Sequence, residues 1–439
     1  MKKIITSVKT ISKQMVIIIC CFFISCGYSY AQGKYTELCT YLSTVVAQHS
    51  SIVHIDTIGK SVQGKNIFAV KISDNPNIDE NEPELLIEGA THGAELKGYD
   101  LISPYFIDYL TNNYGTDQLI TQLINTREIW FVPMVNPDGA SKPTPNDDNA
   151  NGTNLNRDYG YMWNGASPNP FSQPETKIMR NFFINNQFIV AVSHHDGANS
   201  VGYAWSATSE KPTDFAMDTI AKGYATRANP AYPYGQAAKI IYTAVGSSKD
   251  FYYGTRGAMS WTLETGSQIG QNLFNQNKNS LLYLIEAVGY GLTGVVTDVS
   301  SGSPIGAMIT VKNFAPVYGD PVVGDYHKFV TSGTYPVTVW ANGYEKKSVS
   351  NIVITRNSAT ELNVSLQKNN KYYAQEITGC YIKDVTTKYP LYTANALGPV
   401  DNVSLSLGKL GWVILDMGKN IDNKNGTDFK IYEGNVDAT

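Results

Sequence analysis

Short apolar runs alternate with helix-like stretches between about residue 35 and residue 290. Runs of roughly four to eight apolar residues between turn residues are typical of buried strands. Helices are predicted from residue 95 to about 112, from 174 to about 186, and over 271–291. The alternation predicts an α/β domain over residues 32–290, with a mixed twisted sheet flanked by helices. Its predicted strands are 67–73 (IFAVKIS), 84–90 (ELLIEGA), 128–135 (EIWFVPMV), 188–195 (FIVAVSHH) and 260–266 (SWTLETG).

The pattern changes near Gly291 to short alternating strands and turns. Strands with period-two alternation between turn residues predict a small antiparallel β-sandwich over residues 291–368. The stretch 369–439 is also β-like, and we expect it to be a β-rich segment cut inside a module at its last residue. The predicted architecture is therefore an α/β domain followed by all-β sandwich modules.

Residues 1–31 have the layout of a secretory signal peptide. A basic stretch precedes an apolar core that is short for a membrane span, and small residues at Ser29 and Ala31 follow. Lipidation of Cys26 is the less favoured alternative, because Phe23 fits the recognition pattern poorly. We expect a protein that is secreted, periplasmic or at the cell surface, with no integral membrane segment after cleavage.

Composition narrows the possible partners. Of the 439 residues 16% are charged, and the formal net charge is −4. The mild acidity gives no electrostatic reason to expect nucleic acid as a partner. Outside the signal peptide only Cys39 and Cys380 remain, and they define neither a disulfide framework nor a CxxC metal site.

Candidate chemistry follows two of the predicted strands. His92 and Glu95 lie in the stretch THGAE, just past one strand, and His195 ends another. Ligand sites in α/β sheets gather at the carboxyl ends of strands. Catalytic zinc commonly takes three ligands of these types and leaves a fourth position for water. A His and a Glu three apart also occur by chance in many helices, so this motif alone does not establish a zinc site.

Four sequence blocks, in one order, make the chain resemble the zinc metallocarboxypeptidases of the carboxypeptidase A and B type. The similarity covers about residues 35–290, and the following sandwich is similar to the transthyretin-like domain of the regulatory subfamily. Tyr242 and Glu264 stand 22 residues apart, as expected in that family. The blocks are THGAE, NPDG with NLNRD, SHHDGA, and IYTAVGSSKDFYYGTRGAMSWTLETG.

The resemblance implies a role for each matched residue. His92, Glu95 and His195 would hold Zn²⁺, and Glu264 would be the general base that activates water. His194 adjoins His195, but adjacent strand side chains face opposite ways, and the following Asp-Gly-Ala favours His195 as the ligand.

Substrate binding is implied for a second set of residues. Asn156 and Arg157 would grip the terminal carboxylate of a peptide, and Tyr242 would close over the bound residue. Lys249 stands at the position that lines the pocket for the terminal side chain in the family. A lysine there suits acidic ends, unless its side chain tilts to solvent instead.

Two positions depart from the family pattern. Asp147 stands where an arginine usually stabilises the oxyanion, and loss of such a donor lowers turnover about 100- to 1000-fold. Asn154 stands where an aspartate often orients a zinc-bound histidine, and an amide oxygen gives weaker support. Lys142 or Arg256 could supply the missing positive charge.

Three function classes follow from these residues. The leading one is an exported zinc metallocarboxypeptidase acting on peptides, including acidic or cell-wall (peptidoglycan-derived) ends, with reduced activity because of Asp147. The second is a zinc amidohydrolase that deacylates amino acids, against which the Tyr242 and Glu264 spacing speaks. The third is a catalytically weakened module that binds peptide ends. The sequence does not indicate an oligomeric state.

Overall fold

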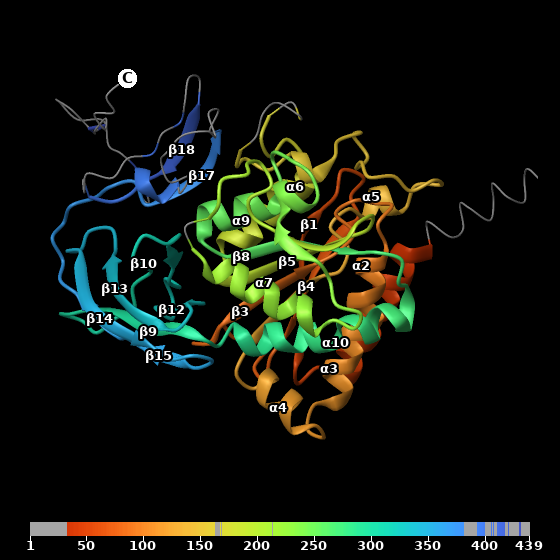
Figure 1. The fold of residues 1–439 in the computed structure, drawn as a ribbon, viewed down its shortest axis with the longest axis horizontal. Coiled ribbons are helices and arrows are strands. Elements are labelled where there is room, and N and C mark those ends of the chain that lie inside the picture. Colours follow the sequence, from red (N-terminus) through yellow and green to blue (C-terminus); the bar gives the residue numbers. More distant parts are fainter. Residues whose placement is uncertain are drawn as a thin grey trace, which may run out of the picture.

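The computed structural model describes residues 33–162, 167, 169–212, 214–381, 393–399, 405, 407, 411–417, 420 and 430–431. The predicted signal peptide, the alternative lipidation site at Cys26 and much of the stretch beyond residue 381 lie outside these residues. An α/β part with a central mixed sheet is followed by strand-rich parts (Figure 1), so the predicted fold class is confirmed. Within the described residues, no helix combines the length and the apolar character that crossing a membrane requires.

Eight strands form the central sheet, in the order β1-β2-β4-β3-β5-β8-β6-β7. The middle strands β4, β3, β5 and β8 run parallel, whereas β1, β2 and β6 pair with a neighbour in the antiparallel sense. Every residue of β3, β4 and β5 is buried, which explains their continuous apolar runs. The strands are β1 (Val53–Lys60), β2 (Asn66–Ile72), β3 (Glu84–Glu88), β4 (Glu128–Val132), β5 (Phe188–His195), β6 (Asn199–Tyr203), β7 (Tyr234–Gln236) and β8 (Met259–Thr265).

Helices flank this sheet. The helix predicted from residue 95 is divided into three pieces, because Pro104 lies inside it and has no N–H for the helical ladder. The helical segments are 33–49, α2 (Lys97–Asp100), η1 (Leu101–Phe106), α3 (Ile107–Asn113), α4 (Gln118–Ile124), α5 (Pro137–Ala140), η2 (Leu155–Arg157), α6 (Pro174–Ile184), α7 (Ala216–Arg227), α8 (Ala237–Ile240), α9 (Ser248–Arg256) and α10 (Gly270–Ala287).

The next eight strands form two facing sheets with an apolar core of their own. One sheet has the order β11-β10-β13-β14, and the other has β12-β9-β15, with β16 also pairing with β9. We call this unit the sandwich. Its strands are β9 (Gly291–Asp298), β10 (Met308–Val311), β11 (Val317–Tyr318), β12 (Asp325–Lys328), β13 (Gly333–Trp340), β14 (Lys347–Ile354), β15 (Ala359–Glu361) and β16 (Val364–Leu366).

A buried ion pair joins the sandwich to the α/β part. Lys328 Nζ on β12 lies 3.3 Å from Asp214 Oδ2, and both side chains are at most 1% exposed. The ammonium also donates to the carbonyl of Ala315, at 2.8 Å. Burial raises the pKa of Asp214 and lowers that of Lys328, so each charge depends on the other for its compensation.

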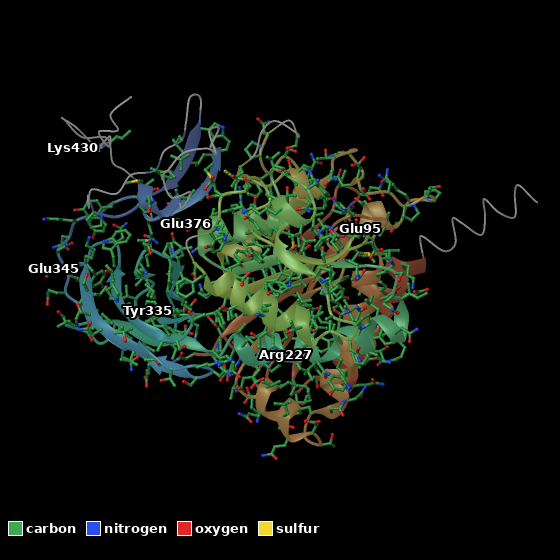
Figure 2. All side chains as sticks on the ribbon, in the orientation of Figure 1. Glu95, Arg227, Tyr335, Glu345, Glu376 and Lys430 are labelled. Atoms are coloured by element: carbon green, nitrogen blue, oxygen red, sulfur yellow. The ribbon has the colours of Figure 1, made fainter. Side chains whose placement is uncertain are left out.

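The last strands, β17 (Glu376–Tyr381) and β18 (Trp412–Asp416), pair with each other; η3 (Thr393–Ala396) lies between them in sequence. This hairpin packs on the α/β part. The Cys380 N–H donates to the Gly160 carbonyl at 2.7 Å, and Glu376 accepts from Arg256 at 2.7 Å. In Figure 2, Glu376 lies above the sandwich, and Glu95 lies on the side of the α/β part away from Tyr335 of the sandwich.

Candidate active site

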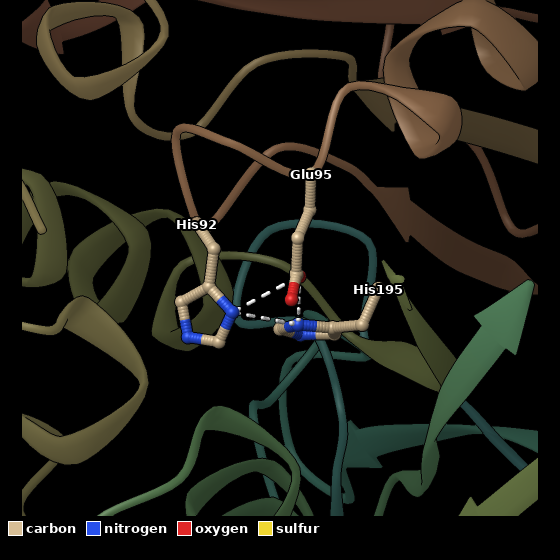
Figure 3. A group of neighbouring side chains, drawn as sticks. All are labelled: His92, Glu95 and His195. Carbon is tan, nitrogen blue, oxygen red and sulfur yellow. Dashed lines mark hydrogen bonds and ion pairs between the residues drawn. The ribbon is translucent and has the colours of Figure 1, made fainter. Parts of the chain in front are cut away.

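Three side chains converge at the carboxyl ends of β3 and β5 (Figure 3). Glu95 Oε2 lies 2.9 Å from His92 Nδ1 and 2.7 Å from His195 Nδ1, and the two nitrogens are 3.3 Å apart. All three side chains are largely shielded from solvent. Two imidazole nitrogens and one carboxylate oxygen facing a common point form a donor set that suits zinc.

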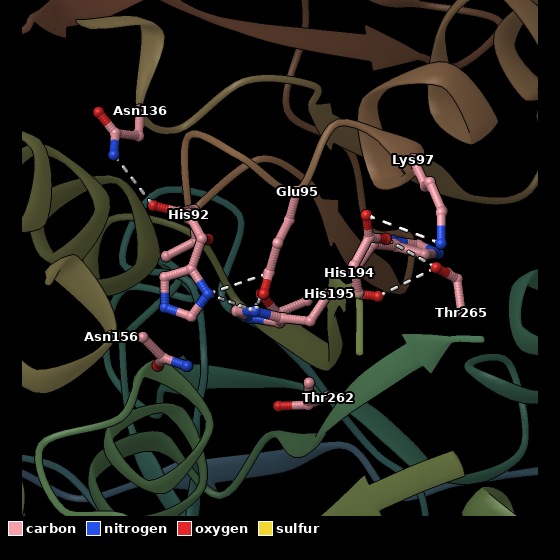
Figure 4. A network of polar contacts seen from close by, with 12 residues as sticks. His92, Glu95, Lys97, Asn136, Asn156, His194, His195, Thr262 and Thr265 are labelled. Carbon is pink, nitrogen blue, oxygen red and sulfur yellow. Dashed lines mark hydrogen bonds and ion pairs between the residues drawn. The ribbon is translucent and has the colours of Figure 1, made fainter. Parts of the chain in front are cut away.

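The loop that carries His92 is held by a close backbone contact and by an asparagine. A Cβ on Gly93 would collide with the backbone of Gly139 in α5, so only glycine fits at this position. Asn136, which caps α5 by accepting from the Gly139 N–H at 2.9 Å, also donates to the Thr91 carbonyl at 3.3 Å. Figure 4 shows Asn136 beside the His92 loop. These contacts fix where the loop places its imidazole.

The outward nitrogens of both imidazoles have partners. His92 Nε2 lies 3.2 Å from Asn154 Oδ1, and His195 Nε2 lies 3.0 Å from Ser193 Oγ. Such partners fix the orientation of a metal-binding histidine and turn its other nitrogen toward the ion. Asn154 therefore occupies the orienting position expected for it. The donor set fits zinc in orientation as well as in composition.

The charge of the group also suits a cation. Burial opposes ionisation of Glu95, but the two imidazoles outweigh it and lower the pKa of this carboxyl to about 2. Burial lowers the pKa of His195 despite the nearby Glu95, which favours the neutral ring that a metal requires. Burial also disfavours protonation of His92, yet Glu95 and Asp147 raise its pKa.

His194 points to the other face of β5, as the alternation predicts. Its side chain is fully buried, and Nδ1 lies 3.2 Å from the Glu88 carbonyl. Burial lowers the pKa of His194 to about 4, so the ring is neutral at physiological pH. This histidine packs against the neighbouring strand and takes no part in the converging group.

Glu264 lies on β8 directly opposite His195 of β5 in the parallel register. Residues paired in register present their side chains on the same face of a sheet, which places Glu264 beside the converging group. Burial and the Glu95 charge raise the pKa of Glu264 to about 7, although Lys249 acts in the opposite sense. A carboxyl of this pKa can take up and release a proton near neutrality.

Arg157 and Tyr242 meet although they are 85 residues apart. Arg157 Nη2 donates to the Tyr242 hydroxyl at 3.1 Å, and 58% of the Tyr242 side chain is exposed. Asn156 is buried, and its Oδ1 accepts from the Ser248 N–H at 3.1 Å. A guanidinium and an exposed phenol thus stand together where a carboxylate could bind.

Lys249 does not tilt to solvent. Its side chain is buried, and Nζ donates to Thr262 Oγ1 at 2.9 Å. Thr262 precedes Glu264 by two residues on β8, so both side chains point to one face. Burial lowers the pKa of Lys249 to about 8, while Asp250 and Glu264 favour its charged form.

The residues suggested as replacements for the oxyanion arginine are engaged elsewhere. Lys142 donates to Asn146 Oδ1 and to two backbone carbonyls of the same loop, at 2.6–3.0 Å. Arg256 binds Glu376 and the Ile184 carbonyl. The suggestion for Arg256 is therefore wrong, because this side chain anchors the β17–β18 hairpin. Asp147 is exposed, and its charge acts on His92.

Sequence reasoning missed Ser193, Glu88 and Thr262. Ser193 supports His195, and Glu88 lies opposite Ser193 in the register of β3 and β5. Burial raises the pKa of Glu88 to about 7, and the hydroxyls of Ser193, Tyr252 and Ser248 oppose that shift. A usable signal was present in the sequence. Ser193 precedes His195 by two positions on one strand and Thr262 precedes Glu264 by two on another, so each side chain lies on the same face as the site residue that follows it.

Comparisons with known proteins agree with this geometry. Residues 38–286 match the family model described as zinc carboxypeptidase, Peptidase M14. Human carboxypeptidase D is 26% identical over 366 residues, covering 75% of this chain and 26% of that protein. Mouse carboxypeptidase M is 28% identical over 346 residues, which cover 70% of this chain and 77% of that protein. The chain thus spans about a quarter of the carboxypeptidase D relatives. A structure of bovine thrombin-activatable fibrinolysis inhibitor aligns with TM-score 0.48 at 19% identity, covering 57% of this chain and 93% of that one.

Proposed function

Because the chain belongs to the zinc carboxypeptidase family, we propose that it is an exported zinc-dependent enzyme that removes C-terminal residues from peptides. One observation carries the proposal: the inward-facing group of His92, Glu95 and His195 lies beside Glu264. Three such donors with an adjacent carboxyl suit metal-assisted hydrolysis. The predicted signal peptide over residues 1–31 supports export.

The chemistry divides among the chain's own groups. Zinc held by the three donors would supply a Lewis acid and lower the pKa of a bound water toward about 7. Glu264 takes a proton from the attacking water and passes it to the leaving amine. Arg157 and Asn156 bind the terminal carboxylate, which selects a chain end over a chain interior. Tyr242, exposed and already bonded to Arg157, covers the bound residue.

The proposed substrate preference is a peptide with a C-terminal glutamate or aspartate. Lys249 presents a buried ammonium on the β8 face that carries Glu264, and a substrate carboxylate would replace part of its lost hydration. Peptides derived from the cell wall would be one source of such ends for an exported enzyme.

A peptide release assay with zinc-loaded protein tests this function. Cleavage should stop after removal of zinc with a chelator and return when zinc is restored. His92→Ala and His195→Ala should lose most bound zinc, and Glu264→Gln should keep zinc but release no product. His194→Ala, the neighbouring histidine, is the matched control and should keep zinc. Stoichiometric zinc in both ligand variants would contradict the proposal. Peptide binding without cleavage would favour the binding module.

A further inference from the structure

A second group of carboxylates lies at the opposite end of β3. Asp79 belongs to the loop before this strand, Glu84 begins it, and Glu128 begins the adjacent parallel strand β4. One carboxylate oxygen from each lies within 4.8 Å of the others. The proposed active site lies past the carboxyl ends of these strands, so the length of strands β3 and β4 separates the two groups.

Glu84 is the most informative member. Its side chain is 5% exposed, and Oε1 accepts from the Gln187 N–H at 3.2 Å. Its other oxygen, Oε2, is inaccessible to solvent and has no hydrogen-bond partner among the described residues. A buried carboxylate oxygen without a partner is costly, and a bound cation would satisfy it.

The one ammonium that pairs with this group, that of Lys71, does not neutralise its three carboxylates. Glu128 Oε2 pairs with Lys71 Nζ at 2.7 Å, and Oε1 accepts from the Glu80 N–H at 3.0 Å. With all three carboxylates ionised, the one ammonium leaves a net charge of −2, which one divalent cation would neutralise. Partial burial and like charges raise the pKa of Asp79 to about 7, and burial with the charges of Glu128 and Asp79 raises the pKa of Glu84 well above its usual range, so the three carboxyls do not all ionise without a compensating cation.

The sandwich adds to this negative charge. Asp320 and Asp325 are among the charges that act on Asp79, and Asp325 lies on β12 next to the α/β part. The group therefore faces the junction of the two units, where Lys328 and Asp214 also meet. A cation here would offset carboxylates from both sides.

We propose that Asp79, Glu84 and Glu128 bind a structural divalent cation of the calcium type at this junction. Ligands that are all oxygen exclude a preference for zinc, which favours nitrogen and sulfur. Calcium accepts irregular sets of carboxylate, carbonyl and water oxygens, whereas magnesium demands a near-ideal octahedron. Three carboxylates from a loop and two strand starts do not form a regular octahedron, so calcium fits better.

Calorimetric titration of zinc-loaded, full-length protein with calcium chloride tests the proposal. We expect one calcium per chain, and Tm should rise by several degrees when calcium is well above its Kd. Glu84→Gln and Asp79→Asn should each weaken calcium binding about tenfold or more while bound zinc is unchanged. Glu82→Gln, in the neighbouring group of Asp74, Glu80 and Glu82, is the matched control and should bind calcium as wild type does.

Three results would overturn the site. One is no heat of binding and no stabilisation at millimolar calcium. Another is full affinity in both Glu84→Gln and Asp79→Asn. The third is loss of binding in Glu82→Gln alone, which would place the ion in the neighbouring group. If Glu84→Gln does not fold, the calcium affinity of Asp79→Asn tests the site, because Asp79 is exposed and its replacement leaves the core unchanged. His92→Ala should keep calcium binding, which separates this site from the zinc ligands.

Discussion

Lys249 couples the proposed substrate preference to pH. Its pKa of about 8 lies below the ordinary lysine value because the side chain is buried. The ammonium is therefore charged below about pH 8 and loses its charge as pH rises above that value. We expect kcat/KM for a Glu-ended peptide to exceed that for a Gln-ended one by about tenfold or more at pH 7.

This ratio should fall toward one between pH 7 and pH 9.5, since kcat/KM reports the ionisation of the free enzyme. Lys249→Met should hold the ratio near one at every pH, so the difference from wild type is largest at pH 7 and disappears by about pH 9.5. A Glu/Gln ratio that is unchanged by the substitution would show that Lys249 does not contact the terminal side chain.

Asp147 should slow the reaction, because negative charge develops on the former carbonyl oxygen in the transition state. The carboxylate is exposed and acts on His92, and the nearby Lys142 is held by its own loop. Asp147→Arg should raise kcat with a smaller effect on KM, since the new interaction forms mainly in the transition state.

Asn146→Arg adds one positive charge one residue earlier on the same exposed loop and serves as the control, whereas Asp147→Arg changes the charge by two. A gain from Asn146→Arg that is about half as large in free energy would indicate a general field effect. A loss of activity in Asp147→Arg alone would show that Asp147 has a useful role.

At the scale of elements, the strand β5 supplies both a proposed ligand and its support. Ser193 and His195 lie two apart, face the same side, and are joined by the 3.0 Å contact between Oγ and Nε2. Loss of such a supporting partner typically lowers metal affinity about 10- to 100-fold. Ser193→Ala should therefore weaken zinc binding by that factor, measured by competition with a chelating dye.

Ser260→Ala is the control for this prediction. Ser260 is a fully buried serine of the same sheet, and its hydroxyl donates to the Lys249 carbonyl at 2.6 Å. Both variants lose one buried hydroxyl, but only Ser193→Ala should change zinc affinity. Equal affinities in the two variants would reduce Ser193 to a packing role.

Sequence reasoning located the central strands and the helices α6 and α10, but it missed the helices α7 and α9. β3, β4 and β5 are buried on both faces and carry nearly continuous apolar runs, whereas β8 alternates apolar and polar residues, as a strand with two different faces does. The helix α9 is nearly all buried although it is rich in polar residues, Lys249 and Asp250 among them, so its polar pattern does not indicate which face meets the core. The helix α7 does have its buried residues at helical spacing, and its pattern could have been predicted.

The candidate site could be predicted only in part, for a related reason. His92, Glu95 and His195 were identifiable because their residue types are rare and follow strands. Their supports, Ser193 and Glu88, are common residue types. Ser193 could have been found from its position two residues before His195 on one strand, whereas the place of Glu88 depends on register between β3 and β5. Register describes how two strands that are distant in sequence pair with each other, and the residue pattern of one strand does not predict it.

At the scale of the whole molecule, the ion pair of Asp214 and Lys328 should make the sandwich and the α/β part depend on each other. Removing one partner of a buried pair leaves an uncompensated charge and typically costs about 3–5 kcal/mol. Lys328→Met should lower the free energy of unfolding by about this amount, measured with urea.

The double variant Asp214→Leu with Lys328→Met should be more stable than either single variant, because no charge is then buried. Effects that simply add in the double variant would show that the two groups do not interact. Lys312→Met, at an exposed lysine of the sandwich whose ammonium lies 5.9 Å from the Phe314 ring centre, should change stability little.

The fixed orientation of the two imidazoles has a consequence for how the chain acquires its metal. Asn154 and Ser193 hold His92 and His195 through contacts within the folded chain, so we expect the donors to be arranged by folding itself. We therefore expect zinc to bind after folding, unlike in small zinc fingers, where the ion drives folding. Matching circular dichroism spectra of zinc-free and zinc-loaded protein would bear this order out, and an unfolded zinc-free protein would refute it.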